Sequence, residues 1–226
     1  MNGARESKLA STLVATRTAS VTLLRGADLV ASPWKNGGGL TREIAASRSP
    51  ALRSVPGAFD WRVSVADVAQ SGPFSRFYGV DRTLVLLEGA GMLLDEAGPR
   101  PATHALMQPL DIVRFAGEKA ISARLVDGPT RDFNLMVRRE TARASLEVWR
   151  APVARAIAAQ TVLLYCHGAG AAVAVRVNDR ESSFALAAGD TLRIDAADGA
   201  QPVKLETQGE GVLLAVTLDT FEAPTA

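Results

Sequence analysis

Short segments in which apolar and polar residues alternate are the most regular feature of the chain. Residues 61–68 (WRVSVADV) show this period of two, and the apolar runs 83–91 (TLVLLEGAG) and 161–170 (TVLLYCHGAG) both end in a Gly-Ala-Gly turn. Gly or Pro interrupts the pattern at intervals of about 8 to 12 residues, which is typical of antiparallel sandwiches and barrels. Residues 151–159 lack strong strand character, and we expect a short helical connection there. The pattern therefore predicts an all-β protein.

The sequence contains an internal repeat of β-rich segments. The two Gly-Ala-Gly turns begin at Gly89 and Gly168, 79 positions apart, and the same spacing matches Asp111 with Asp190. A period near 80 residues is too long for a solenoid or a propeller blade. We therefore expect one small barrel or jelly roll to occur twice in tandem.

The two copies differ in composition. Residues 18–144 hold the polar, aromatic and glycine-rich segments, whereas residues 145–226 consist mostly of Ala, Val, Leu and Gly. We expect the first module to carry the function and the second to be structural. Residues 1–17 are weakly patterned, and we expect them to form a disordered N-terminus.

A glycine-rich stretch, residues 32–45 (SPWKNGGGLTREIA), concentrates polar groups beside a flexible backbone. Three consecutive glycines, Gly37 to Gly39, have no Cβ, so the backbone can adopt positive φ and approach another group closely. That group is either a ligand or a neighbouring strand, and a tight loop with solvated charges is the simpler interpretation.

Composition excludes several classes of partner. The 25 Lys and Arg nearly balance the 24 Asp and Glu, giving a formal charge of +1, so no basic field is available for nucleic acid or for a membrane surface. The single cysteine, Cys166, suggests a reducing compartment. No apolar run is long enough to span a bilayer, and no secretory signal is recognised, so we expect a cytoplasmic protein.

Histidines are too few for a metal site of the kind that many β-barrel enzymes use. His104 and His167 lie in different repeats, and neither belongs to a His-x-His pair. A divalent first-row metal needs several converging nitrogen or oxygen ligands. We expect no metal and no cofactor.

Four strings, at 33–45, 59–68, 72–89 and 132–139, resemble those of the HutD/Ves family in the same order. The resemblance implies a double cupin, or bicupin, made of two jelly rolls, and a genomic link to histidine utilisation in many members. It implies no established reaction. Proposals for the family centre on binding an intermediate of histidine catabolism, urocanate or formylglutamate, in a regulatory or flux-limiting role.

Cations and amides in the first module suit recognition of a carboxylate, because a guanidinium can hold both of its oxygens. In residues 132–139 (DFNLMVRR), alternation places Asn134, Met136 and Arg138 on one face of a strand. The same alternation in residues 61–68 places Arg62 with Ser64. We expect these two polar faces and the glycine-rich stretch to form one pocket for a small organic acid. The predicted ligand-binding residues are Trp34, Lys35, Asn36, Arg42, Glu43, Arg62, Ser64, Phe74, Arg82, Asn134, Met136 and Arg138.

Two other interpretations stay open. The protein could be a metal-free enzyme in which Glu43 and Lys35 act as general acid and base, although Glu43 is better explained as neutralising Arg42 or Arg62. It could also be a structural bicupin that binds a protein partner. A homodimer through edge strands is possible.

Overall fold

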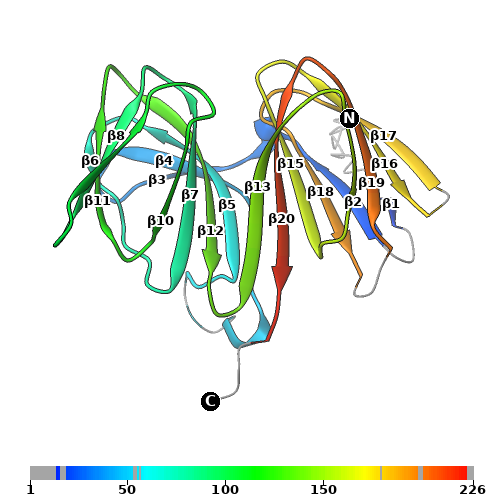
Figure 1. Cartoon of the computed structure of the whole chain (residues 1–226), viewed down its shortest axis with the longest axis horizontal. Helices are drawn as coiled ribbons and strands as arrows, with labels where there is room; N and C mark the ends of the chain where they lie inside the picture. The colour runs from blue at the N-terminus through cyan, green and yellow to red at the C-terminus, as the bar shows by residue number, and fades with distance from the viewer. Residues whose placement is uncertain are drawn as a thin grey trace, which may run out of the picture. The chain divides into compact units, whose positions relative to one another are not determined.

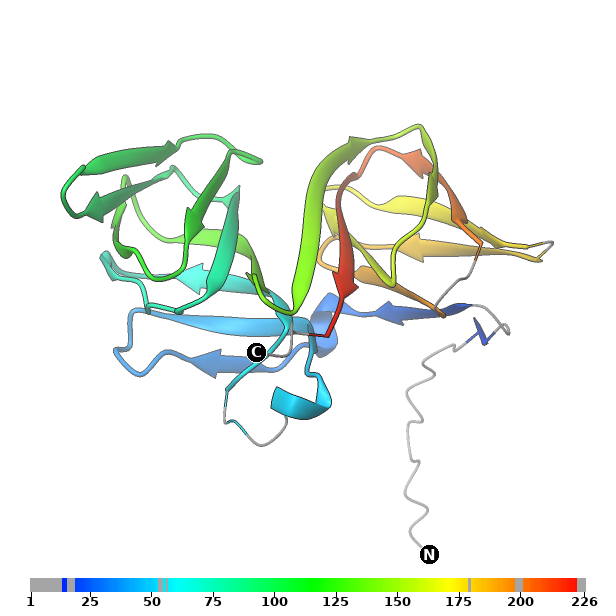
Figure 2. The same ribbon diagram turned by 60° about the horizontal axis from the view of Figure 1, so that its bottom comes forward.

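The computed structural model describes residues 14–15, 19–52, 55, 57–178, 180–197 and 201–222. It divides into two compact units. The 27–148 unit contains Ala27–Val148 with the described residues from Leu218 onward, and the 149–217 unit contains Trp149–Thr217 with the described residues up to Gly26. Figures 1 and 2 show both units, each of which is built from strands.

In the 27–148 unit, a six-stranded and a four-stranded antiparallel sheet enclose one core. The six-stranded sheet has the order β10-β7-β12-β5-β4-β3 and the four-stranded sheet the order β6-β11-β8-β9. The strands are β3 (Ala31–Pro33), β4 (Gly39–Ser47), β5 (Trp61–Val68), β6 (Gly72–Pro73), β7 (Val80–Glu88), β8 (Met92–Ala97), β9 (Ala102–Leu106), β10 (Ile112–Ala116), β11 (Ala120–Leu125) and β12 (Thr130–Arg138).

The 149–217 unit repeats this plan. Its six-stranded sheet has the order β1-β2-β18-β15-β20-β13 and its four-stranded sheet the order β14-β19-β16-β17. The strands are β1 (Val14–Ala15), β2 (Ala19–Leu24), β13 (Ala142–Arg150), β14 (Val153–Ile157), β15 (Thr161–His167), β16 (Ala171–Val177), β17 (Arg180–Leu186), β18 (Thr191–Ala196), β19 (Val203–Gly209) and β20 (Val212–Thr220). Strands β13 and β20 each continue into the 27–148 unit.

The matching strand orders bear out the predicted duplication of an all-β module. β8-β9 in one four-stranded sheet corresponds to β16-β17 in the other, and β10-β7-β12-β5 corresponds to β18-β15-β20-β13. The repeated aspartates have the same task in both copies. Asp111 accepts hydrogen bonds from the backbone N–H groups of Met107 and Gln108, and Asp190 accepts one from Ala187 across the same turn.

Two expectations about the course of the chain meet a different arrangement, and a third falls almost wholly outside the described residues. The segment 151–159 contains β14, which pairs with β19, because the backbone of Val153–Ile157 finds ladder partners there; the expected helical connection was wrong. Ala19–Leu24 belongs to the 149–217 unit because it pairs with β18, although the expected first module began at residue 18. Of residues 1–17, expected to be disordered, all but Val14–Ala15 lie outside the described part of the chain.

Helix is confined, in the part of the chain that the structure describes, to two turns of 3₁₀ helix, η1 (Gly26–Asp28) and η2 (Pro50–Leu52). Accordingly, no helix among these residues is long and apolar enough to cross a membrane.

Candidate functional site

The glycine-rich stretch serves a close approach between strands. A Cβ on Gly39 would lie 2.4 Å from the carbonyl oxygen of Asp67 on β5, so only glycine fits at this point of β4. Gly37 has a φ of 70°, and the loop is closed by a hydrogen bond from the backbone N–H of Trp34 to the carbonyl of Gly39. Of the two sequence interpretations, the geometry supports the neighbouring strand.

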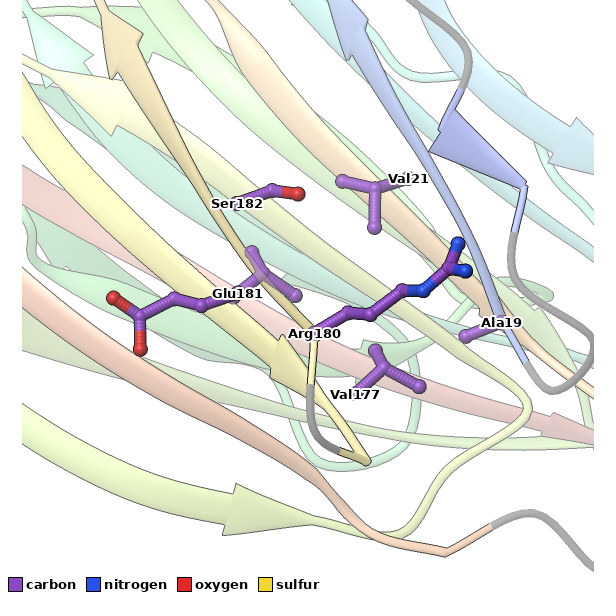
Figure 3. Close-up of a pocket in the computed structure, with 7 residues that line it drawn as sticks. Ala19, Val21, Val177, Arg180, Glu181 and Ser182 are labelled. Carbon is purple, nitrogen blue, oxygen red and sulfur yellow. The ribbon is translucent and has the colours of Figure 1, made fainter.

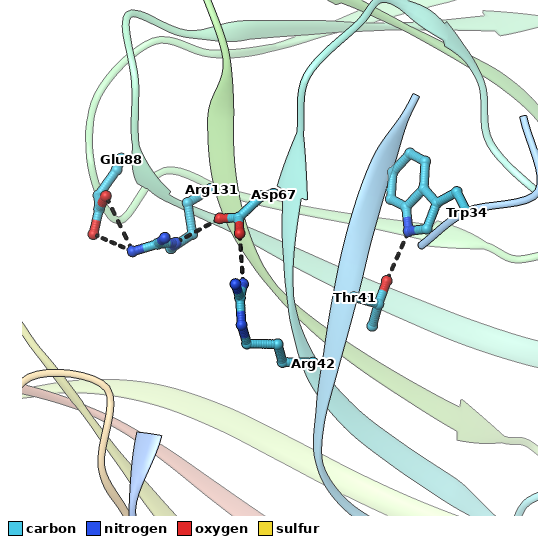
Figure 4. Close-up of polar contacts among 6 residues, drawn as sticks. All are labelled: Trp34, Thr41, Arg42, Asp67, Glu88 and Arg131. Atoms are coloured by element: carbon cyan, nitrogen blue, oxygen red, sulfur yellow. Dashed lines mark hydrogen bonds and ion pairs between the residues drawn. The ribbon is translucent and has the colours of Figure 1, made fainter. Parts of the chain in front are cut away.

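The polar residues of this stretch point to several places. Lys35, Asn36 and Glu43 are exposed, and Oδ1 of Asn36 accepts a hydrogen bond from the N–H of Gly38 within the loop. The indole of Trp34 donates to Oγ1 of Thr41 at 2.8 Å (Figure 4). The stretch as a whole therefore does not form one binding surface.

Arg42 is held in an ion-pair network across four strands. Its guanidinium contacts the carboxylate of Asp67 at 2.5 Å, and Asp67 also accepts from Arg131, which in turn contacts Glu88 (Figure 4). Arg42 pairs with Val65 in the strand register, so it has the opposite parity to Arg62 and Ser64. The network is explained by pairing between strands and needs no ligand.

The interior face of the six-stranded sheet gathers a second set of predicted residues. In the register of β5, β12 and β7, Met136 lies between Arg62 and Arg82, and Asn134 lies beside Ser64. Side chains of this parity face the core that Leu84, Leu86 and Phe115 share with the four-stranded sheet. The sequence prediction that Asn134 and Met136 share one strand face is confirmed.

Arg82 is buried among aromatic rings. It is 7% exposed, and its guanidinium carbon lies 5.1–5.8 Å from the ring centroids of Phe74, Phe77 and Phe115. Its one hydrogen bond to a described residue is a long one, 3.5 Å from Nη1 to the carbonyl of Ser75, and its Nε is buried without a partner. Burial, followed by the nearby Arg62, lowers the pKa of Arg82 to about 10.

Arg62, on β5, also approaches the ring of Phe77. Its guanidinium lies 5.2 Å from the ring of Phe59 and 5.7 Å from that of Phe77, and Nη2 donates to Sδ of Met136 at 3.3 Å. Its Nε is also buried without a partner. Burial lowers the pKa of Arg62, and the exposed Glu43 opposes that shift without forming an ion pair with it.

Two cations thus share one aromatic ring, that of Phe77, in a poorly hydrated interior. Among the described residues, no carboxylate lies within ion-pair distance of Arg62 or Arg82, whereas seven other arginines have such a partner: Arg25, Arg42, Arg124, Arg131, Arg139, Arg176 and Arg193. Buried like charges repel, and each costs free energy unless an opposite charge compensates it. Asp132 and Glu43 act on these charges without forming ion pairs with them, so the two guanidinium groups could hold an anion.

The far end of the same face carries unpartnered acceptors. Asp132 is fully buried and neither carboxylate oxygen has a hydrogen-bond partner, and the same is true of Oδ1 of Asn134, Oγ of Ser64 and Oγ1 of Thr130. Burial raises the pKa of Asp132 to about 7, with a further increase from Asp67 and an opposing effect of Arg82. Buried polar groups nearly always find partners, so these atoms could accept hydrogen bonds from water or from a bound polar molecule.

The sequence prediction missed Asp132, Thr130, Phe59, Phe77 and Phe115. Asp132 and Thr130 share the parity of Asn134, so alternation along β12 was a signal that could have found them. The three rings come from separate segments, and no local pattern brings them together. Arg138, which was predicted, lies at the end of β12, where its Nε donates to the carbonyl of Phe59 at 3.1 Å.

No group of three or more His, Cys, Asp or Glu that could hold a metal ion occurs among the residues that the structure describes.

A separate hollow of about 190 Å³ lies in the 149–217 unit. Its walls come from β2, β16 and β17, and Figure 3 shows the side chain of Arg180 extending across it toward Ala19. Arg180 is exposed, and none of the lining residues has a buried polar atom without a partner. The hollow therefore lacks the chemical signal found in the 27–148 unit.

Sequence comparison relates the chain to bacterial proteins described as HutD and Ves. A family model described as HutD matches residues 26–215. The chain is 37% identical over 194 residues to an uncharacterized 21.2 kDa protein in the hutC 3' region of Pseudomonas putida, covering 85% of this chain and 95% of that protein. It is 40% identical over 116 residues to Protein Ves of Citrobacter koseri, which is 51% of this chain and 56% of that protein.

Solved structures agree with this placement. A conserved protein of unknown function from Pseudomonas aeruginosa PAO1 has a TM-score of 0.75 at 34% identity, and HutD from Pseudomonas fluorescens SBW25 has 0.72 at 32%; both matches cover 89% of this chain and 100% of the other. Oxalate decarboxylase of Lactobacillus farciminis has a TM-score of 0.59 at 9% identity, covering 89% of this chain and 87% of that one. This last similarity shows the fold alone, and it bears out the predicted double cupin.

Proposed function

The chain belongs to the HutD family, and we propose that it binds a small carboxylic acid on the interior face of the 27–148 unit. The observation that carries this proposal is the pair of guanidinium groups of the half-buried Arg62 and the buried Arg82, which share the ring of Phe77 and have no ion-pair partner among the described residues. A carboxylate would compensate both charges and accept directed hydrogen bonds from them.

The ligand we propose is an intermediate of histidine catabolism, urocanate or formylglutamate. The supporting observation is the relative in Pseudomonas putida, which is named for the hutC 3' region. A flat acid such as urocanate also suits a site with several aromatic rings, because planar groups stack on ring faces. Binding without turnover would give the protein a regulatory or flux-limiting role.

An enzymatic role for Glu43 and Lys35 has less support. Both side chains are exposed, and Lys35 lies on the glycine-rich loop rather than on the interior face with Arg62 and Arg82. A general base must come within hydrogen-bond reach of the proton that it removes.

Isothermal titration calorimetry with urocanate and with formylglutamate tests the proposal. Replacing Arg62 with Ala or Arg82 with Met should weaken binding about 10- to 100-fold, since a hydrogen bond to a charged group contributes roughly 1.5–3 kcal/mol. The matched control is Arg114→Ala. Arg114 is an exposed cation on β10 next to Phe115 and has the opposite parity, so its loss should leave affinity unchanged.

Two results would contradict the proposal. Unchanged affinity in both interior variants, each shown to be folded, would remove the arginine pair from the site. A fall in urocanate absorbance during incubation with the purified protein would show turnover and replace a binding function with a catalytic one.

A further inference from the structure

On the interior face of the six-stranded sheet, Arg62 and Arg82 lie at one end and Asp132 lies at the other. We infer that the bound acid carries a hydrogen-bond donor, such as an N–H group, at the end remote from its carboxylate. This inference rests on the proposed function, because it assumes that the arginine pair holds the carboxylate. It adds the class of ligand: a monocarboxylic acid with a distant donor rather than a dicarboxylic acid.

The spacing along β12 separates the two ends. Met136 lies opposite Arg82, whereas Asp132 lies opposite Leu86, four residues farther along the strand. Four residues of a β-strand span roughly 13 Å, and the arginine side chain covers part of that length. Arg82 and Asp132 still act on each other electrostatically, so a ligand that contacts both groups need only be somewhat longer than a single carboxylate.

The far end is rich in acceptors. Both oxygens of Asp132, Oδ1 of Asn134 and the hydroxyl oxygens of Ser64 and Thr130 are buried without partners. A ligand N–H would satisfy one of these oxygens, whereas a second carboxylate would require Asp132 to be protonated, because two like charges in one buried site repel.

Apolar side chains of β7 lie beside Asn134 and Asp132 on this face. Leu84 lies opposite Asn134 and Leu86 opposite Asp132 on β7, and both leucines are buried in the core cluster. A flat or apolar connecting segment in the ligand would pack against them without leaving polar groups unsatisfied.

A matched pair of acids tests the inference. 3-(Pyrrol-2-yl)acrylate has an N–H where 3-(furan-2-yl)acrylate has an oxygen, the two are nearly the same size, and neither ring titrates near neutral pH. We expect calorimetry to show the pyrrole acid binding about 10- to 100-fold more tightly, the effect of one hydrogen bond to a buried acceptor.

Replacing Asp132 with Leu should reduce this difference to less than about threefold, because the principal acceptor is lost. Asp132→Ala serves if the leucine variant does not fold. Asp127→Asn removes a charge from an exposed turn of the same unit and should preserve the full difference.

The outcomes separate this inference from the proposed function. Equal affinity of the wild-type protein for the two acids, with both weakened by Arg82→Met, overturns the donor and leaves the carboxylate site standing. Tighter binding of formylglutamate than of the pyrrole acid overturns the preference for a monocarboxylate. Failure of every acid to bind overturns the proposed function and the inference with it.

Discussion

The two units share a strand order but differ in what their six-stranded sheets present to the core. Where β7 of the 27–148 unit places Arg82 opposite Phe115, β15 of the 149–217 unit places Val162 opposite Ile194. Leu213 of β20 occupies the position that the repeat matches to Asn134. The same scaffold therefore exists with a polar interior and with an apolar one, and the apolar copy shows that the fold does not need the charges.

This difference indicates that the polar residues of the 27–148 unit are kept for binding rather than for stability. Buried charges without partners destabilise a protein, and the unpartnered atoms of Asp132 and Arg82 add to that cost. The comparison yields four predictions, taken from the largest expected effect to the smallest.

Introducing an arginine into the apolar core of the 149–217 unit should cause the largest loss of stability. Val162→Arg places an unpaired charge in a core where Val162 is 1% exposed, and we expect the free energy of unfolding to fall by about 3–5 kcal/mol. Urea unfolding measures this, with Val162→Leu as the control for a change of size. A loss below about 1 kcal/mol would mean that this interior accommodates charge as well as the other one does.

Removing the buried acid should change how stability depends on pH. The pKa of Asp132 is raised from 3.8 to about 7, so the folded protein binds this proton more tightly than the unfolded chain does, and stability falls as the pH rises between these values. Asp132→Asn removes the ionising group and therefore removes this fall in stability with pH. We expect the variant to match the wild type below about pH 4 and to exceed it by about 4 kcal/mol above pH 7. A difference that does not vary with pH would contradict the raised pKa.

Replacing the buried cation with an apolar side chain of similar length should stabilise the free protein while weakening ligand binding. Arg82→Met keeps packing against the rings of Phe74, Phe77 and Phe115, and we expect a gain of about 1–2 kcal/mol. Thermal unfolding with and without urocanate measures both effects. A variant that is less stable and binds normally would assign Arg82 a structural role.

Truncating Lys35 should have the smallest effect. Lys35 is exposed on the glycine-rich loop, so Lys35→Ala should alter stability by less than about 0.5 kcal/mol and affinity by less than about twofold. A tenfold loss of affinity, measured by calorimetry, would show that the glycine-rich loop takes part in ligand binding.

The sequence predicts the fold well because its signals are local. Alternation along residues 61–68 and 132–139 sets which side chains share a face, and the turns closed by Asp111 and Asp190 repeat at a fixed spacing. Each of these patterns depends on neighbours in the chain. The strand register then follows from which face is apolar.

The site is predicted only in part because its remaining features depend on distant contacts. The approach of Gly39 to Asp67 and the gathering of Phe74, Phe77 and Phe115 around Arg82 join segments that no local pattern connects. Arg42 carries the same charge as Arg62, but its partner Asp67 is 25 residues away in the sequence. Residue type alone does not distinguish a paired arginine from an unpaired one.

The pairing of β2 with β18 has a consequence for biosynthesis. The ribosome makes Ala19–Leu24 first, and its partner Thr191–Ala196 emerges some 170 residues later, after roughly 10–30 s at ordinary elongation rates. Throughout that interval Ala19–Leu24 lacks its β18 partner. The nascent chain therefore carries an exposed segment that chaperones could shield. Stalling or truncation before residue 191 would release a polypeptide with this edge permanently open to aggregation.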